Sequence, residues 1–592
     1  MSERPDIVIV MTDEERATPC YEASDVLDWR RRVLSGRRWF DDHGVSFSRH
    51  YTGSLACVPS RPTIFTGQYP DVHGVTQTDG IGKAADDSRM RWLPRGEVPT
   101  LGNWLRAAGY DTHYDGKWHI SHADLIDSAT GQPVATNDDD GIVDPAAVRR
   151  YLDADPLAPY GFSGWVGPEP HGGLLANSGI RRDPLIADRV VAWLSDRYER
   201  RRAGDPEALR PFLLVASFVN PHDIVLFPAW SGPSPGSNPI RPSELDSPAV
   251  PPAPTADEDL SAKPAAQIAF RESYYSGYGP AAFVERTYRR NAQRYRDLYY
   301  RLHAEVDGPI DRVRRAVTEN GSANAVLVRT SDHGELLGAH GGLHQKWFNL
   351  YDEATRVPFV IARIGDSPTA PREVCAPTSH VDLVPTLLSA AGVDVAAAAA
   401  VLAESFSEVH DLPGRDLMPV VDGAAPDENR PVYLLTRDNM LEGDSGASGL
   451  ARRLNRIDPV PGPLRIRLPA HVGANFEGLV VRVDSGVPVD ARGHLWKLVR
   501  SFDDPATWTE PGVRHLAANG MGGQAYRNAP IEDQWELYDL TADPIEAVNR
   551  WHDPDLDELR RELCAQLAQV REASVPRRHR PWPYAPRRAR RG

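Results

Sequence analysis

Short, strongly apolar segments alternate with longer amphipathic segments through the first two thirds of the chain, and this alternation restricts the fold more than any other feature. The amphipathic segments, such as 185–200 and 294–318, have the periodicity of helices. Alternating strands and helices are typical of an α/β fold, and near-continuous apolar strands are typical of a sheet buried on both faces. We therefore predict a large mixed, mostly parallel sheet sandwiched by helices. Its predicted strands are 6–11, 111–115, 212–218, 325–329 and 359–362.

The composition changes near residues 423–429, and this change predicts two domains. Beyond it the chain has shorter strand patterns and a closing helical pattern at 557–573. We predict a large α/β domain over 1–425 and a small C-terminal α+β domain over 426–592. Within the first, the Pro-, Ser- and Asp-rich segment 227–264 is an insertion, read either as a lid over a site or as an irregular surface loop.

The charge balance excludes some classes of partner. There are 67 Lys and Arg against 82 Asp and Glu, a net charge of −15, which argues against nucleic acid as a partner. The one basic block, 577–591, is predicted to be a solvated chain end, with an RNA or membrane contact as the alternative. Oligomeric state cannot be read from these patterns.

We predict a reduced, cytosolic protein with no membrane partner. The chain begins without a secretory leader, and no apolar run approaches the roughly 20 residues that span a bilayer. The four cysteines, Cys20, Cys57, Cys375 and Cys564, are far apart and lack the spacing of a disulfide framework or a metal finger.

Polar and titratable residues follow four of the predicted strands. Ligands of open α/β sheets bind outside the carboxyl ends of the strands, so these clusters are expected to converge. Acidic groups with one imidazole suit a divalent cation, and lysines with histidines suit binding of an oxyanion and proton transfer. Taken alone, each of these polar clusters has an ordinary structural explanation, such as an Asp that caps a helix. The clusters are Asp13-Glu14, Lys117-Trp118-His119, Asn220-Pro221-His222 and Asp332-His333.

The segment Cys57-Val58-Pro59-Ser60-Arg61 resembles the Cys-x-Pro-Ser-Arg signature of the formylglycine-dependent sulfatases, in the alkaline-phosphatase-like superfamily. Further stretches of the chain match other motifs of this family, in the same order along the sequence. The resemblance extends along nearly the whole chain and implies the alkaline-phosphatase-like fold. The other matching stretches are 116–119, 331–335, Lys346 with 353–358, and 536–540 with 543–544.

The resemblance implies a sulfate monoester hydrolase in which a formylglycine-generating enzyme oxidises Cys57. One divalent metal, expected to be calcium with manganese as the alternative, would be held by Asp13, Glu14, residue 57, Asp332 and His333. Arg61 and Lys117 would support the formylglycine hydrate, and His119 would accept its proton. His222 and Lys346 would bind sulfate and assist the departing oxygen.

Several positions depart from the family pattern. Glu14 stands where many members carry Asp, and His333 replaces the Asn of arylsulfatases, as in choline sulfatases and phosphonate monoester hydrolases. Lys117 and His119, which those hydrolases typically lack, favour sulfate esters. The Asn that both relatives carry further along is not evident, because Thr78 and Asp79 stand there.

These departures leave three alternatives: a sulfatase, a phosphonate monoester or phosphodiester hydrolase on the same scaffold, and an inactive binding protein of the same fold. The sequence also leaves open whether His340 and His344 line the leaving-group pocket or lie on an exposed loop.

Overall fold

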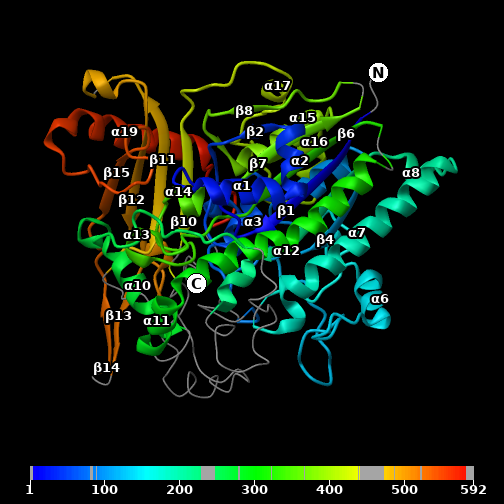
Figure 1. Ribbon diagram of the computed structural model, residues 1–592, viewed down its shortest axis with the longest axis horizontal. Coiled ribbons are helices and arrows are strands. Elements are labelled where there is room, and N and C mark those ends of the chain that lie inside the picture. Colours follow the sequence, from blue (N-terminus) through cyan, green and yellow to red (C-terminus); the bar gives the residue numbers. More distant parts are fainter. Residues whose placement is uncertain are drawn as a thin grey trace, which may run out of the picture.

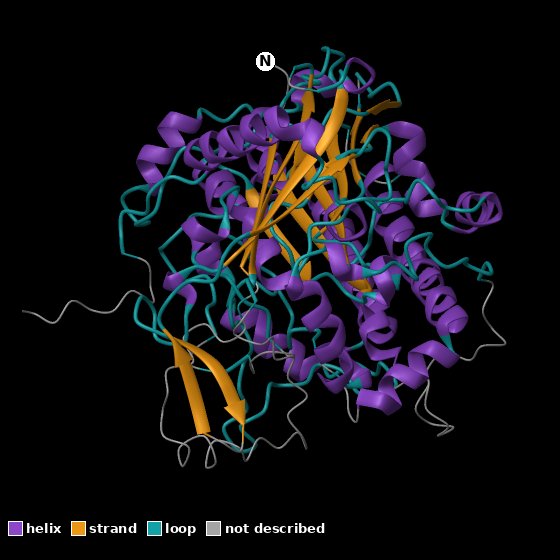
Figure 2. Ribbon diagram, turned by 90° about the vertical axis from the view of Figure 1, so that its left-hand side faces the viewer, coloured by secondary structure: helices purple, strands orange, loops and turns teal. Residues whose placement is uncertain are grey.

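The computed structural model is organised around one seven-stranded sheet with helices on both sides (Figures 1 and 2). It describes residues 4–581 apart from 80–84, 88–89, 172, 228–246, 278–280, 320, 322, 366, 438, 440–471, 486 and 521–522. The strand order is β4-β5-β1-β6-β7-β2-β8. Neighbouring strands from β4 to β6 are parallel, whereas β7 runs antiparallel to β6 and to β2. The predicted mixed, mostly parallel sheet is therefore confirmed. The strands are β1 (Asp6–Asp13), β2 (Val45–Phe47), β4 (Asp111–Gly116), β5 (Phe212–Pro221), β6 (Ala325–Ser331), β7 (Phe359–Ile364) and β8 (Arg372–Val374).

Alternate side chains of the central strand β1 enter two different cores, as the period of a strand requires. Ile7 and Ile9 pack on one face with α3, α5 and α15, whereas Val8 and Val10 pack on the other with α2, α7 and α12. Both faces are thus buried, which explains the continuous apolar runs in the sequence. These helices are α2 (Ser35–His43), α3 (Cys57–Thr66), α5 (Leu101–Ala107), α7 (Gly179–Arg202), α12 (Ala292–Thr318) and α15 (Leu383–Ala390).

The C-terminal part forms a second, antiparallel sheet of order β10-β11-β12-β15, covered by helix α19 (Asp557–Ser574). Leu559, Leu563 and Leu567 of α19 pack against this sheet. The predicted smaller α+β part is confirmed, while the boundary at 425/426 stays a prediction. The strands here are β10 (Val432–Arg437), β11 (Asn475–Val483), β12 (His494–Phe502) and β15 (Gln534–Asp539), with the hairpin β13 (His515–Gly520) and β14 (Gly523–Arg527) beside them.

The remaining elements are shorter or peripheral. They are α1 (Ser24–Val33), β3 (His50–Tyr51), α4 (Pro70–His73), α6 (Pro145–Ala154), α8 (Pro206–Leu209), α10 (Ala265–Gly277), α11 (Ala281–Arg290), α13 (Ala339–Gly342), α14 (Asp352–Thr355), β9 (Thr378–Ser379), α16 (Val395–Leu402) and α17 (Met418–Val421).

The end of the Pro-rich segment is packed into the protein. Residues 228–246 lie outside the described residues, but Val250 and Leu260 are buried in a core that they share with both parts of the chain. Lys263 donates hydrogen bonds to the Tyr538 hydroxyl and the Glu546 carbonyl, at 2.9 and 2.8 Å. This part of the insertion therefore joins the large domain to the C-terminal sheet.

The expectation of a solvated basic tail is wrong for Arg578, whereas Arg577, His579 and Arg580 are exposed as expected. The Arg578 side chain is only 7% exposed and forms an ion pair with Glu97. The backbone amides of His579 and Arg580 donate to the Glu408 carboxylate at 2.9 and 2.8 Å. Buried carboxylates far away in the sequence hold this segment, while 582–592 lie outside the described residues.

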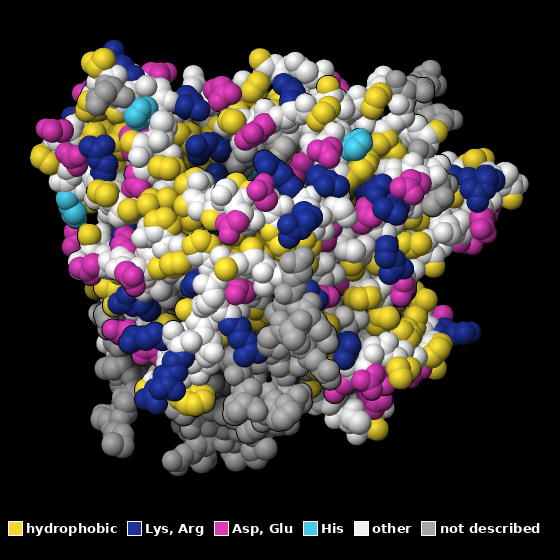
Figure 3. All heavy atoms as spheres, in the orientation of Figure 1, with side chains coloured by type: hydrophobic (Ala, Val, Ile, Leu, Met, Phe, Trp, Pro, Cys, Tyr) yellow, Lys and Arg dark blue, Asp and Glu magenta, His cyan; other side chains and the backbone are white. Residues whose placement is uncertain are grey.

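Charges on the surface are mixed. On the face shown in Figure 3, Lys and Arg side chains are interspersed with Asp and Glu. Among the described residues, no single helix is long and apolar enough to cross a membrane. Only the pair His380–Ala390 and Val395–Leu402, bent by 108°, passes that test together.

His340 and His344 are buried, so the exposed-loop reading of these two residues is wrong. His340 lies 3.0 Å from Glu258 and 3.4 Å from Glu353, and its ring stacks on Tyr351. Burial alone would lower the pKa of His340, but the two carboxylates raise it to about 9. The imidazolium therefore links the end of the insertion to α14 at neutral pH.

We expect His340→Gln to lower stability in a pH-dependent way. Because the folded pKa exceeds the unfolded value, the stabilisation is complete below about pH 6.5 and is lost as the pH rises through about 9, a difference of roughly 3 kcal/mol. The melting temperatures of wild type and variant, measured from pH 6 to 10, should converge at the alkaline end. His552→Gln, at an exposed position, is the control; a gap that is the same at every pH would contradict the ion-pair account.

Candidate active site

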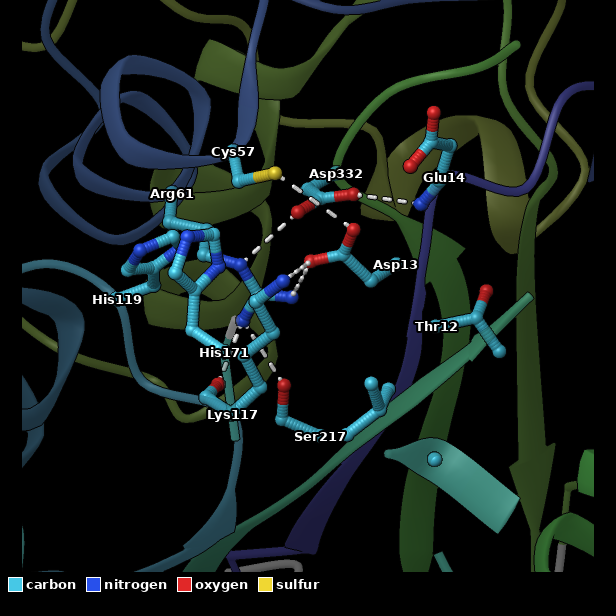
Figure 4. Close-up of polar contacts among 12 residues, drawn as sticks. Thr12, Asp13, Glu14, Cys57, Arg61, Lys117, His119, His171, Ser217 and Asp332 are labelled. Carbon is cyan, nitrogen blue, oxygen red and sulfur yellow. Dashed lines mark hydrogen bonds and ion pairs between the residues drawn. The ribbon is translucent and has the colours of Figure 1, made fainter. Parts of the chain in front are cut away.

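The predicted polar clusters meet at one edge of the central sheet. Asp13 is the last residue of β1, and Lys117, His222 and Asp332 directly follow β4, β5 and β6. Because these four strands are parallel and adjacent, their carboxyl ends lie together. Figure 4 shows Asp13, Lys117 and Asp332 gathered around Arg61. Gly116 makes the turn before Lys117, with a φ of +101° and a Cβ position that would collide with the Ser217 carbonyl oxygen.

Cys57 reaches the same edge from the start of helix α3. Its Sγ lies 3.1 Å from His333 Nε2 and 3.7 Å from Asp13 Oδ1. The preceding Ala56 has a φ of +61°, and Ser60 donates a 2.6 Å hydrogen bond to the Asp332 carbonyl, which fixes the first turn of α3. All ten residues of α3 are buried, so the position of Cys57 is held by the core.

The environment of Cys57 disfavours a thiolate. Burial, followed by the charge of Asp13, raises the pKa of the Cys57 thiol far above its ordinary value, and Lys346 and Lys117 offset only part of this. Since the thiolate is the nucleophilic form of cysteine, the encoded side chain is a poor nucleophile at neutral pH.

Arg61 holds the two aspartates together. Its Nε and Nη2 atoms lie 2.9 Å from Asp332 Oδ2 and Asp13 Oδ2, and Lys117 Nζ lies 2.8 Å from the same Asp13 oxygen. Burial alone would raise the pKa of Asp13, but Lys117, His222 and Arg61 bring it well below its ordinary value. Burial and the neighbouring Asp13 raise the pKa of Asp332 to about 7.

The donor set fits a divalent cation. Donor atoms of Asp13, Cys57, Asp332 and His333 all lie within 4.8 Å of one another. His333 Nδ1 is 2.9 Å from the Gly334 carbonyl; a carbonyl only accepts, so we assign the proton to Nδ1 and the lone pair to Nε2. Carboxylate oxygens with a neutral imidazole oriented in this way are typical of metal sites.

Glu14 and His222 lie beside this group and not within it. Their donor atoms lie within 4.8 Å of an Asp13 oxygen. Glu14 Oε2 accepts from Lys346 Nζ at 3.1 Å, and its buried Oε1 has no partner among the described residues. Lys117 and Lys346 thus bring two buried cations to the predicted oxyanion site.

His119 makes contacts that the sequence motifs do not show. Its Nε2 is 2.6 Å from Asp79 Oδ1, and its backbone amide donates to Glu169 at 3.0 Å. The His171 ring lies 4.6 Å from the His119 ring, and both are drawn in Figure 4. Asp79 stood out in the sequence only as a departure from the family, and Glu169 and His171 lie in a loop without a motif, so no sequence signal indicated them.

Comparison with known proteins agrees with this arrangement. Residues 5–393 match the family model described as Sulfatase. The chain is 28% identical to an uncharacterised sulfatase of Escherichia coli K12, over 66% of this chain and 68% of that protein. It is 25% identical to a choline-sulfatase of Rhizobium meliloti, over 73% and 74%.

Solved structures share the fold. A 2-O GAG sulfatase superimposes with a TM-score of 0.59 at 19% identity, over 97% of this chain and 93% of that one. The phosphonate monoester hydrolase of Agrobacterium radiobacter superimposes with a TM-score of 0.53 at 20% identity, over 97% and 96%. These likenesses confirm the alkaline-phosphatase-like architecture.

We expect the protein, once stripped with a chelator, to bind about one Ca²⁺ per chain in a calorimetric titration. Asp332→Asn should weaken this binding at least tenfold, since it removes one negative charge from the donor set. Asp205→Asn, which keeps a capping side chain at the start of α8, is the control and should bind like wild type. Undiminished binding by Asp332→Asn would mean that the ion binds elsewhere.

Proposed function

The chain belongs to the Sulfatase family, and on that premise we propose that it hydrolyses a small sulfate monoester to an alcohol and inorganic sulfate. The observation that carries the proposal is the position of residue 57. It starts a buried helix and faces two aspartates and a histidine, with two lysines and an arginine around them. Every charged position of the predicted cluster holds a residue of a type that can perform the role assigned to it. This argues against the alternative of an inactive binding protein.

We propose that Cys57 is oxidised to formylglycine by a formylglycine-generating enzyme. The raised thiol pKa supports this, because an unmodified Cys57 would be protonated and unreactive. A hydrated aldehyde carries two hydroxyls on one carbon. One can attack sulfur, and deprotonation of the other can then release sulfate and restore the aldehyde, so no second attack at sulfur is needed.

Asp13, Asp332 and His333 would hold the divalent metal together with residue 57. Glu14 would be a further ligand through Oε1, which has no hydrogen-bond partner among the described residues. When bound, such an ion supplies Lewis-acid stabilisation of negative charge. Calcium is our proposal because oxygen donors predominate, and manganese is the alternative because imidazole is a softer donor.

The other residues act on the ester through charge and proton transfer. Arg61 and Lys117 would orient the hydrate, and Lys346 with Lys117 would bind the sulfate oxygens. His222, beside Asp13 and Glu14, and Lys346 would stabilise the departing alcohol oxygen. His119 would accept the proton whose removal releases sulfate. The cytosolic location stays a prediction, which cell fractionation would test.

Replacement of Cys57 tests the nucleophile. We expect Cys57→Ala to fold with an unchanged melting temperature within a few degrees and to lose at least 10³-fold in turnover of 4-nitrophenyl sulfate, because the group that attacks sulfur is gone. Cys375→Ala, at an exposed cysteine, is the control. In active wild type, the mass of the peptide that contains residue 57 should show the aldehyde; an intact thiol there, alkylated by iodoacetamide, would exclude the mechanism.

The second candidate is a phosphonate monoester hydrolase, favoured by His333 in place of the Asn of arylsulfatases. Retention of Lys117 and His119 in the site favours the sulfate ester. We therefore expect kcat/KM for 4-nitrophenyl sulfate to exceed that for the phenylphosphonate ester of the same phenol by at least tenfold. A strong preference for the phosphonate would reverse the assignment.

A further inference from the structure

A buried carboxylate stands behind the histidine proposed to accept the proton. Asp79 is 5% exposed and His119 is fully buried, and their side chains meet at 2.6 Å. Burial alone would raise the pKa of Asp79, but His171 and His119 bring it below its ordinary value. Asp79 is therefore a carboxylate at neutral pH and can only accept a hydrogen bond.

This contact determines the tautomer of His119. Because Asp79 accepts, Nε2 of His119 carries the hydrogen and Nδ1 carries the lone pair. His119 Nδ1 is buried and has no hydrogen-bond partner among the described residues. Burial lowers the pKa of His119 to about 3, so the ring is neutral in the free site. The backbone is also held, since the amide of His119, at a φ of +53°, donates to Glu169.

The cluster that Asp79 and His119 form with His171 has metal-ligating residue types, and donor atoms of the three lie within 4.8 Å of one another. Two observations favour a hydrogen bond over a second metal. The Asp79–His119 separation of 2.6 Å is a donor–acceptor distance. The Nδ1 atoms of both histidines also lack the outer acceptor that orients a metal-bound imidazole, within the part of the chain that the structure describes.

We propose that Asp79 is a positioning residue that fixes His119 as a base acting through Nδ1 in the sulfate-releasing step. The inference rests on the proposed function. After transfer, residue 57 carries one hydroxyl and one sulfate on the same carbon. His119 Nδ1 takes the hydroxyl proton, the electron pair of that O–H bond forms the carbonyl, and the C–O bond to sulfate breaks. Sulfate leaves with the electrons of that bond, and the aldehyde is restored.

This assignment predicts that loss of Asp79 slows the second step and not the first. With 4-nitrophenyl sulfate, Asp79→Asn should release about one equivalent of 4-nitrophenol per active site in a burst and then turn over with kcat lowered roughly 10²-fold. KM should fall in parallel, so that kcat/KM stays within about threefold. The peptide that contains residue 57 should carry the mass of a sulfate group during turnover. Asp539→Asn, which alters the 2.8 Å carboxylate contact to His494 in the C-terminal sheet, is the matched control and should show neither effect.

A double variant separates positioning from general damage. In the His119→Ala background, Asp79→Asn should cause no further loss, because Asp79 is argued to act only through His119. Metal content should remain equal to that of wild type. Unchanged turnover of Asp79→Asn, a full further loss in the His119→Ala background, or the loss of one metal equivalent would each overturn the inference. Failure of the proposed function is a different result: wild-type protein with formylglycine at residue 57 that releases no 4-nitrophenol.

Discussion

The site depends on one buried guanidinium. Arg61 bridges Asp13 and Asp332, and its Nη1 also donates to the Lys117 carbonyl and the Ser217 hydroxyl at 2.6 and 3.0 Å. A single side chain from α3 thus fastens that helix to β1, β5, β6 and the turn after β4. Without it, two neighbouring carboxylates would be buried with less compensation, which is among the most destabilising arrangements in a protein interior.

The acidic groups of the site are only partly ionised before any ion binds, because burial raises the pKa of Glu14 well above its ordinary value and burial with the neighbouring Asp13 raises that of Asp332 to about 7. Asp13, Glu14 and Asp332 supply three acidic groups, and Arg61, Lys117 and Lys346 supply three cations. A bound divalent cation would favour the ionised form of all three acids, and the three basic side chains together with the cation would then give these buried groups an excess of positive charge. Such an excess suits an anionic ester and the additional negative charge that develops as its alcohol departs.

The sequence predicted the parts of the site that follow from strand direction. Asp13, Lys117, His222 and Asp332 each follow an apolar strand, so parallel pairing alone brings them to one edge. The antiparallel direction of β7 was not predictable, because an apolar run carries no sign of its orientation. Arg578 shows a second limit. A basic run at a chain end looks solvated, and its carboxylate partners Glu97 and Glu408 are far away in the sequence.

A third limit concerns contacts between loops. Asp79 and His171 approach His119 from segments with no periodic pattern, so nothing in their spacing predicts the encounter. The difference has a physical origin. Residues at the ends of the strands are positioned by the hydrogen bonding of the sheet, which is the same in every parallel α/β protein. These residues determine the class of reaction. Residues in loops are positioned by packing that is particular to this chain. These residues adjust the rate of each step of the reaction. The reaction class can therefore be read from the sequence, while the control of individual proton transfers becomes visible only when the loops have been placed.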